Sequence, residues 1–200
     1  MRKHLVILTL FLLPAPLSAQ PADGAFNLTL NIQQPLYKEF VGNSSVGMRI
    51  GYTRFSSAKF GWGIEAAYNT LNDYVPRQTY TYPGGAITTD IFNYMYYFTL
   101  LANAQYYYKA SDRLIPYASL GAGLAITRYT LFYNVYSEGD NNRSWVVRPE
   151  AGLIFRVRQY SSLGLKSALS WEYAGNKSDA YALKDFSALS FQLGLVIFSD

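Results

Sequence analysis

Apolar residues occupy every second position over segment after segment of this chain. From Phe26 to Gln33 the sequence reads FNLTLNIQ, in which each apolar residue is followed by a polar one. No segment after Ala25 keeps a 3.6-residue period. Because successive side chains of a β-strand point to opposite faces, this pattern predicts strands with one apolar and one polar face. The chain is therefore expected to be all-β.

Eight segments carry this alternation, at about 26–33, 46–53, 60–69, 96–106, 119–127, 147–157, 163–173 and 189–197. The connections between them alternate in length. Tight turns are expected at 56–59, 110–113 and 159–162, and long loops at about 34–45, 70–90, 130–144 and 174–185. Short and long connections then lie on opposite rims, as in bacterial outer-membrane barrels. The sequence thus predicts an eight-stranded antiparallel up-and-down transmembrane β-barrel.

Composition excludes several other classes. The chain has 200 residues, of which 50% are hydrophobic and 15% charged, and it contains no cysteine, so disorder and disulfide or cysteine-zinc scaffolds are excluded. A mean hydropathy of −0.01 is too low for a bundle of membrane helices. The net charge of +4 is small, and the sequence has no run of basic residues of the kind that binds nucleic acid.

The first residues have the organisation of a secretory signal peptide. Arg2 and Lys3 precede an apolar run from Leu5 to Leu13, and Ala19 suits the last position before cleavage. The run is shorter than the roughly 18 to 20 residues that a spanning helix needs. We therefore expect residues 1–19 to be removed on export and residues 20–200 to form the barrel domain.

Periodicity alone does not decide which face of the strands points outward. The polar face is rich in glycines that suit a narrow interior, namely Gly47, Gly51, Gly61, Gly63, Gly121, Gly123, Gly152, Gly164 and Gly194. The apolar face ends in aromatic residues that suit the headgroup boundary, namely Tyr52, Tyr68, Tyr96, Tyr106, Trp62, Trp171 and Tyr173. Both features favour a membrane barrel, with a secreted soluble barrel of lipocalin type as the alternative.

The segment Ile115–Leu124, which reads IPYASLGAGL, resembles the Pro-Tyr and alternating-glycine strand of small outer-membrane barrels. Over roughly Ala25 to Phe198 the chain is similar to the OmpA/OmpX-type barrels and to the porin-like outer-membrane β-barrel domain. The resemblance implies location in the bacterial outer membrane, contact with its lipid and lipopolysaccharide, and handling by the outer-membrane insertion machinery. It also implies a monomeric barrel with an envelope-structural or surface-binding role.

Charged residues on the polar face would share the interior of such a barrel. They are Arg49, Arg148, Arg156, Lys166, Glu65, Glu150 and Glu172. Counting from the turns places Arg49 opposite Glu65, and Arg148 near Glu172 with Glu150 one pleat away. We expect two salt-bridge clusters, with no acidic neighbour assigned to Arg156 or Lys166. A plugged interior is the main interpretation and a small porin-like channel the alternative.

Residues for catalysis are scarce. The single histidine, His4, lies in the expected signal peptide, so the mature chain would lack an imidazole base, and it has no cysteine nucleophile. No metal-ligand spacing or phosphate-binding loop is present in the sequence. We therefore predict a non-enzymatic protein without cofactor or metal.

The long connections contain tyrosines that could contact a partner outside the cell. The candidates are Tyr74, Tyr80, Tyr82, Tyr133 and Tyr136. Apolar alternation continues from Tyr129 to Val135, ahead of a polar stretch at 138–142, so a hairpin with its tip at 138–142 is expected to protrude there. Tyrosine supplies rigid, amphipathic contact area, which suits binding of an extracellular protein or glycan. Packing of the loops on one another is the alternative reading.

Overall fold

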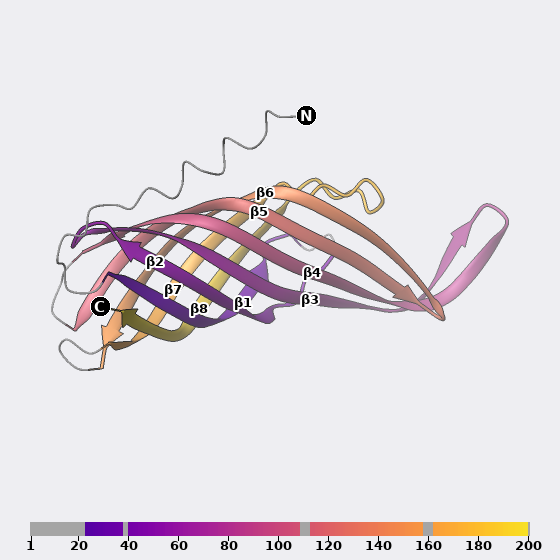
Figure 1. Cartoon of the computed structure of the whole chain (residues 1–200). Coiled ribbons are helices and arrows are strands. Elements are labelled where there is room, and N and C mark those ends of the chain that lie inside the picture. Colours follow the sequence, from indigo (N-terminus) through magenta and orange to yellow (C-terminus); the bar gives the residue numbers. More distant parts are fainter. Residues whose placement is uncertain (1–22, 38–39, 109–112, 158–161, 200) are drawn as a thin grey trace, which may run out of the picture.

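The computed structural model describes residues 23–37, 40–108, 113–157 and 162–199 (Figure 1). The expected signal peptide lies outside these residues, as do most residues of the turns expected at 110–113 and 159–162. The eight strands are β1 (Gly24–Pro35), β2 (Ser45–Phe55), β3 (Phe60–Tyr82), β4 (Gly85–Tyr107), β5 (Leu114–Tyr133), β6 (Tyr136–Arg156), β7 (Leu163–Ala174) and β8 (Phe186–Ser199).

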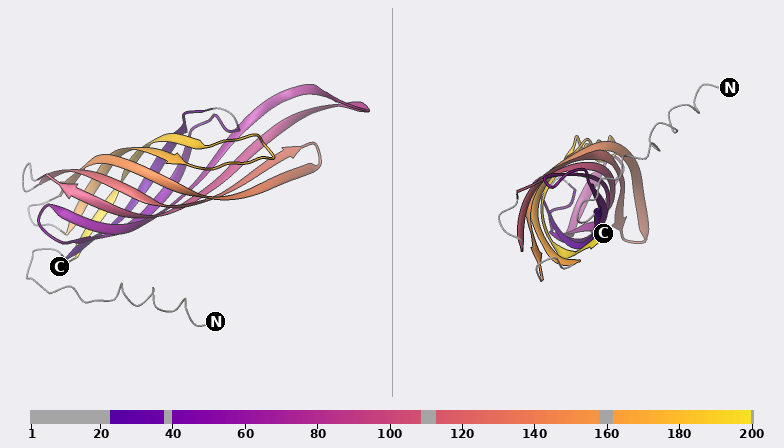
Figure 2. Two further views of the ribbon diagram at one scale, coloured as in Figure 1. Left: turned by 90° about the horizontal axis from the view of Figure 1, so that it is seen from above. Right: turned by 60° about the vertical axis from the view of Figure 1, so that its left-hand side comes forward.

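The strands form one closed antiparallel barrel in sequence order. Each strand pairs with the next, and β1 closes the ring against β8 from Gly24 opposite Ser199 to Pro35 opposite Ala188. Figure 2 shows this ring in its right-hand view. The expected tight turn lies between Phe55 and Phe60. The predicted fold class is therefore confirmed.

The apolar face of the strands points outward. On β1, Leu30 is 55% exposed, whereas its neighbours Thr29 and Asn31 are almost fully buried in the barrel. The same alternation continues around the ring, so the outer wall is an apolar belt, while the middle of the interior carries polar and charged side chains. A soluble barrel needs the opposite arrangement, so the lipocalin-like alternative is wrong. Within the described ranges, no helix has the length and apolar character required to cross a bilayer.

Glycines on the inner face leave room for larger interior side chains. At Gly152, an added Cβ would lie 2.7 Å from the Cβ of Ala168 and 2.7 Å from Cε1 of Tyr117. At Gly47 it would lie 2.0 Å from Oδ1 of Asn69. The glycines of the polar face thus permit a barrel of this size to close around its own side chains.

Two of the expected long loops are largely strand. The β3–β4 hairpin continues to a turn at residues 83–84, where Gly84 has a φ of 104°, and the β5–β6 hairpin turns at Asn134, with a φ of 51°. The prediction of a loop at 70–90 was wrong, and so was most of the loop predicted at 130–144. The protruding hairpin is confirmed, but residues 138–142, expected at its tip, lie within β6. Tyrosine and threonine favour extended backbone even without an apolar face, which explains the extension.

Both hairpins project from one end of the barrel, opposite the end at which β1 begins and β8 ends (Figures 1 and 2). We call this the extracellular end, because outer-membrane barrels carry their longer connections outside the cell. The β3–β4 hairpin bends where its register shifts between Val75 and Gln78. The other two long connections, β1–β2 and β7–β8, have little regular structure, as expected, and lie against the barrel mouth.

Candidate functional site: the charged interior and two extracellular hairpins

Six charged side chains meet in the middle of the barrel. Arg49 lies 3.3 Å from Glu150 and 3.7 Å from Glu65, and Arg148 lies 2.5 Å from Glu65. The network is completed by an Arg148–Glu172 ion pair and by a Lys166–Glu150 pair at 3.1 Å. All six side chains are at most 6% exposed.

This arrangement differs from the sequence expectation in three ways, the first of which is that Lys166, for which no acidic neighbour was expected, pairs with Glu150. The residue opposite Arg49 is Ala67, and Glu65 lies opposite Gly51, so Arg49 reaches Glu65 diagonally across one pleat. The two expected clusters are one network, since Glu150 and Glu65 each bind cations from two strands. Counting from turns compares only neighbouring strands and therefore cannot reveal contacts across the lumen.

Neutral groups add further hydrogen bonds to the network. Tyr117 donates to Glu150 at 2.5 Å, Gln33 donates to Glu172 at 3.1 Å, and Arg148 donates to Thr99 at 2.8 Å. Three cations face three carboxylates, so the network is formally neutral. Buried charges are tolerated when they are paired and hydrogen-bonded in this way. A cavity of about 10 Å³ beside Glu65 and Arg148 is the size of one water molecule.

Arg156 lies apart from the network, toward the periplasmic end. Its guanidinium carbon is 4.1 Å from the centre of the Phe198 ring, which is the geometry of a cation–π contact. Phe198 belongs to a buried apolar cluster with Ala25, Tyr107, Tyr117, Ile154, Ala168 and Val196. This cluster fills the periplasmic end of the interior.

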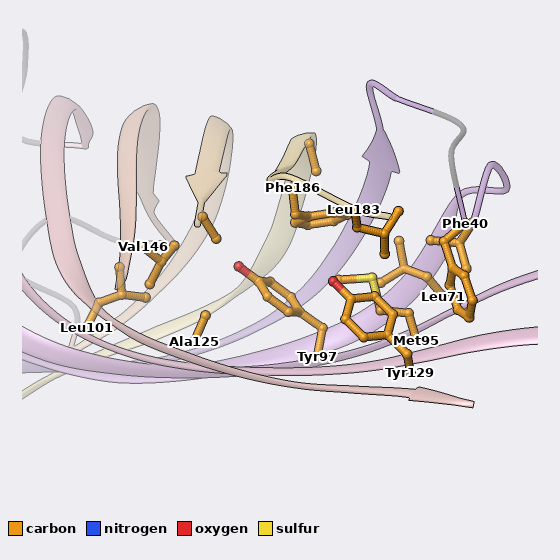
Figure 3. Close-up of a cluster of buried hydrophobic side chains, with 13 residues drawn as sticks. Phe40, Leu71, Met95, Tyr97, Leu101, Ala125, Tyr129, Val146, Leu183 and Phe186 are labelled. Carbon is orange, nitrogen blue, oxygen red and sulfur yellow. The ribbon is translucent and has the colours of Figure 1, made fainter. Parts of the chain in front are cut away.

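A second apolar cluster closes the extracellular mouth (Figure 3). The β1–β2 connection contributes Phe40, whose ring centre lies 5.1 Å from that of Tyr129 on β5. Phe186, at the start of β8, lies 5.0 Å from Tyr97 on β4. The other members are Val41, Leu71, Met95, Leu101, Ala125, Val146, Ala174, Leu183 and Ala188. This cluster, which we call the mouth cluster, was not expected from the sequence, although Phe40, Val41 and Leu183 are apolar residues inside otherwise polar connections.

Hydrogen bonds tie the β7–β8 connection to the β5–β6 hairpin. Tyr129 donates to the carbonyl of Asn176 at 3.3 Å, and Ser178 donates to Asp140 at 2.5 Å. Ser144 also bonds Asn176. The connection is therefore held over the mouth by polar contacts as well as by its apolar residues.

The candidate tyrosines are divided between the two hairpins. Tyr80 and Tyr82 lie near the β3–β4 tip, and Tyr133 and Tyr136 flank the β5–β6 turn with their rings 5.7 Å apart. Tyr74 lies lower on β3, against Phe92 at 4.8 Å. Tyr82 is 57% exposed and Tyr136 60% exposed. The β4–β5 pairing ends at Ile91 opposite Tyr133, so the two tips form separate surfaces.

Metal chemistry receives no support from side-chain placement. Among the described residues, no group of three or more histidine, cysteine, aspartate or glutamate side chains is arranged to hold a metal ion. The lumen carboxylates all contact cations of the barrel. That the chain is non-enzymatic stays a prediction.

No protein-family model matches the chain, and no curated protein sequence does. Solved structures do match its fold. Neisserial surface protein A is 15% identical, with 88% of this chain and 97% of that chain covered and a TM-score of 0.56. The outer-membrane protease OmpT from Escherichia coli is 9% identical, with coverages of 92% and 99% and a TM-score of 0.52.

The attachment invasion locus protein of Yersinia pestis, solved with the heparin analogue sucrose octasulfate, is 14% identical, with coverages of 88% and 96% and a TM-score of 0.50. Such low identities establish the fold and leave the role open, because one fold hosts many functions. The fold and the apolar outer belt together identify the chain as an outer-membrane β-barrel protein, of the small barrel type that its sequence resembles.

Proposed function

We propose that this protein is a non-conducting barrel that presents two tyrosine-bearing hairpins to a partner outside the cell. The observation that carries the proposal is the contrast between the two halves of the molecule. The membrane half is filled by its own side chains, and the extracellular half extends four strands beyond what spanning a bilayer requires.

Three successive layers support a closed lumen. The mouth cluster, the charge network and the periplasmic cluster follow one another along the barrel axis. The network is neutral and its side chains bind one another, so it offers a permeating ion no free site of opposite charge. The porin-like alternative would require all three layers to move, and we do not favour it.

The hairpins support a binding role. β3 and β4 contain 23 residues each, about twice the 9 to 11 residues of a spanning strand. An isolated two-stranded hairpin gains little stability in water, so the extension does not serve the stability of the barrel. Its exposed tyrosines are of the residue type enriched in binding surfaces.

The chemistry of the partner follows from the charges at the extracellular end. Among the described residues, its carboxylates are Asp73, Asp90, Glu138, Asp140, Asp179 and Asp185, and its cations are Arg77, Arg128, Arg143, Lys177 and Lys184. The near balance of charge does not suit a polysulfated ligand of the kind bound by the Yersinia protein. Aromatic tips suit an extracellular protein or an uncharged glycan.

The proposal is tested by adhesion of bacteria that display the protein. The variant carries Tyr82→Ser and Tyr136→Ser, and the matched control carries Tyr37→Ser, an equally exposed tyrosine of the β1–β2 connection. On arrays of matrix proteins and neutral glycans, we expect the wild type and control to bind. The double variant should lose about tenfold or more, as for loss of central aromatic contacts. Equal binding by all three, or none by the wild type, would refute the role.

A further inference from the structure

Two arginines lie side by side on the outer wall of the barrel. Arg128 on β5 is paired with Asn141, and Arg143 on β6 is paired with Ile126, two residues further along the same outward face. Residues in this diagonal relation have backbone positions about 7 to 8 Å apart. Both side chains are exposed on the wall that otherwise forms the apolar belt.

The pair lies at the extracellular edge of the belt. On β6 the outward residues from the periplasmic end are Phe155, Leu153, Ala151, Pro149, Val147 and Trp145, and Arg143 follows. The ten residue steps from Phe155 to Trp145 cover about 33 Å, and the usual strand tilt of about 40° reduces this to a height of about 25 Å. This equals the height of the apolar band, so Arg143, two residues beyond Trp145, and its neighbour Arg128 reach the level of the lipid headgroups.

Aromatic residues border the arginines at this level. Trp145 precedes Arg143 on the outward face, with its ring centre 5.4 Å from that of Tyr173. Tyr96 lies directly opposite Arg128 on β4. Tryptophan and tyrosine mark the membrane interface, which independently places the pair at headgroup height.

The pair also has no counter-charge from the barrel. Over residues 23–37, 40–108, 113–157 and 162–199, no carboxylate forms an ion pair with Arg128 or Arg143. Arg49 and Arg148, by contrast, each bind two carboxylates. Two adjacent guanidinium groups repel one another unless an anion lies between them, and phosphate oxygens match their planar donors.

We propose that Arg128 and Arg143 form a binding site for a phosphate group of a phosphorylated lipid in the outer leaflet. The two guanidinium groups donate to the phosphate oxygens, while the lipid chains lie along the apolar wall below Trp145. The site is on the side of the barrel, so it is independent of the binding role proposed for the hairpins.

The test measures binding of lipid A to the folded protein in detergent micelles by native mass spectrometry. The probes are bisphosphorylated lipid A, the same lipid without phosphates, and inorganic phosphate as competitor. The variant carries Arg128→Gln and Arg143→Gln. The control carries Arg77→Gln and Lys184→Gln, which removes the same charge from exposed extracellular positions away from this wall. A third protein carries Arg128→Lys and Arg143→Lys.

We expect the wild type and the control to bind the bisphosphorylated lipid at least tenfold more tightly than the dephosphorylated one. The glutamine pair should lose this preference, and the lysine pair should recover part of it. The proposal is overturned when the glutamine pair keeps the wild-type preference, when the control loses it equally, or when the wild type has none. Displacement of the lipid by inorganic phosphate at equal concentration would overturn the assignment to a lipid.

Discussion

Arg49 on β2 donates a hydrogen bond to Glu150 on β6 at 3.3 Å, although 101 residues separate them in sequence. The two strands lie on opposite sides of the eight-membered ring. The contact therefore crosses the lumen, and it forms only when the barrel is closed. Since Glu150 also binds Lys166 and Tyr117, its one carboxylate joins β2, β5 and β7 to β6.

Replacing Glu150 with glutamine should strongly destabilise the barrel. The change leaves Arg49 and Lys166 buried with one carboxylate fewer, and loss of one partner of a buried ion pair typically costs about 3 to 5 kcal/mol. We expect the free energy of unfolding by urea in lipid vesicles to fall by an amount of this order. Glu138→Gln, at an exposed carboxylate of β6, is the control and should change stability little.

A second substitution makes this prediction specific to charge balance. Adding Lys166→Met to Glu150→Gln removes the excess cation and restores a formally neutral network. The double variant should then be more stable than Glu150→Gln alone. Equal or lower stability of the double variant would contradict the account of the network as a balanced set of charges.

The refolded wild-type protein should insert into planar bilayers without producing single-channel steps. Apolar clusters lie at both ends of the described interior, and the cavity beside the charge network between them is only about 10 Å³, the size of one water molecule. Because the apolar clusters remain, a protein carrying Arg49→Ala and Glu65→Ala should also stay closed. Insertion is checked by the heat-dependent mobility of the folded barrel on gels. Stable, ion-selective steps from the wild type would refute the closed lumen.

Gly152→Ala should destabilise the barrel by about 1 to 3 kcal/mol, the usual range for overpacking. The new Cβ would lie 2.7 Å from the backbone oxygen of Ser167 and from Cε1 of Tyr117, the residue that donates to Glu150. Gly121→Ala is the control, because the nearest atom to its new Cβ is the flexible end of Leu101 at 3.3 Å, and the next, the backbone oxygen of Arg148 and Cβ of Asn103, lie at 3.7 Å, an ordinary contact distance. Urea unfolding of both variants gives the comparison, and equal losses would contradict the steric argument.

The sequence alone was sufficient to predict the membrane half of this fold. An apolar outer face repeats every second residue on all eight strands, and a closed ring follows from alternating connections. The upper parts of β3 to β6 were not predictable in this way, because above the membrane neither face needs to be apolar. There the strand signal is the weaker one of tyrosine and threonine propensity, as in Thr79 and Tyr80.

The interior contacts were only partly predictable. The seven inward charges follow from alternation, and the pairing of Arg148 with Glu172 follows from the neighbouring turn. The contact of Arg49 with Glu150 depends on the curvature of the whole ring, which no local pattern encodes. The mouth cluster was not predictable for the same reason, because it forms only where the β1–β2 and β7–β8 connections fold back over the barrel.

The β7–β8 connection, residues 175–185, lies over the mouth of the barrel, and we call it the lid. Leu183 is buried in the mouth cluster beside Met95 and Tyr129, and its backbone bridges to Ser178. In Leu183→Ser, the lost apolar contact should release residues 176–185, so that their amide hydrogens exchange at least tenfold faster. The strands should keep their protection, because the barrel pairing does not depend on this side chain.

Lys184→Ser is the matched control for this lid. It removes a longer side chain at the adjacent position, but Lys184 is exposed and outside the cluster. Its exchange rates should equal those of the wild type. Faster exchange in both variants would mean that the connection responds to any change of sequence. Unchanged exchange in Leu183→Ser would mean that hydrogen bonds to β6, such as that from Ser178 to Asp140, hold the lid without the mouth cluster. Either result would contradict the claim that the apolar contacts of the mouth cluster hold the lid over the mouth.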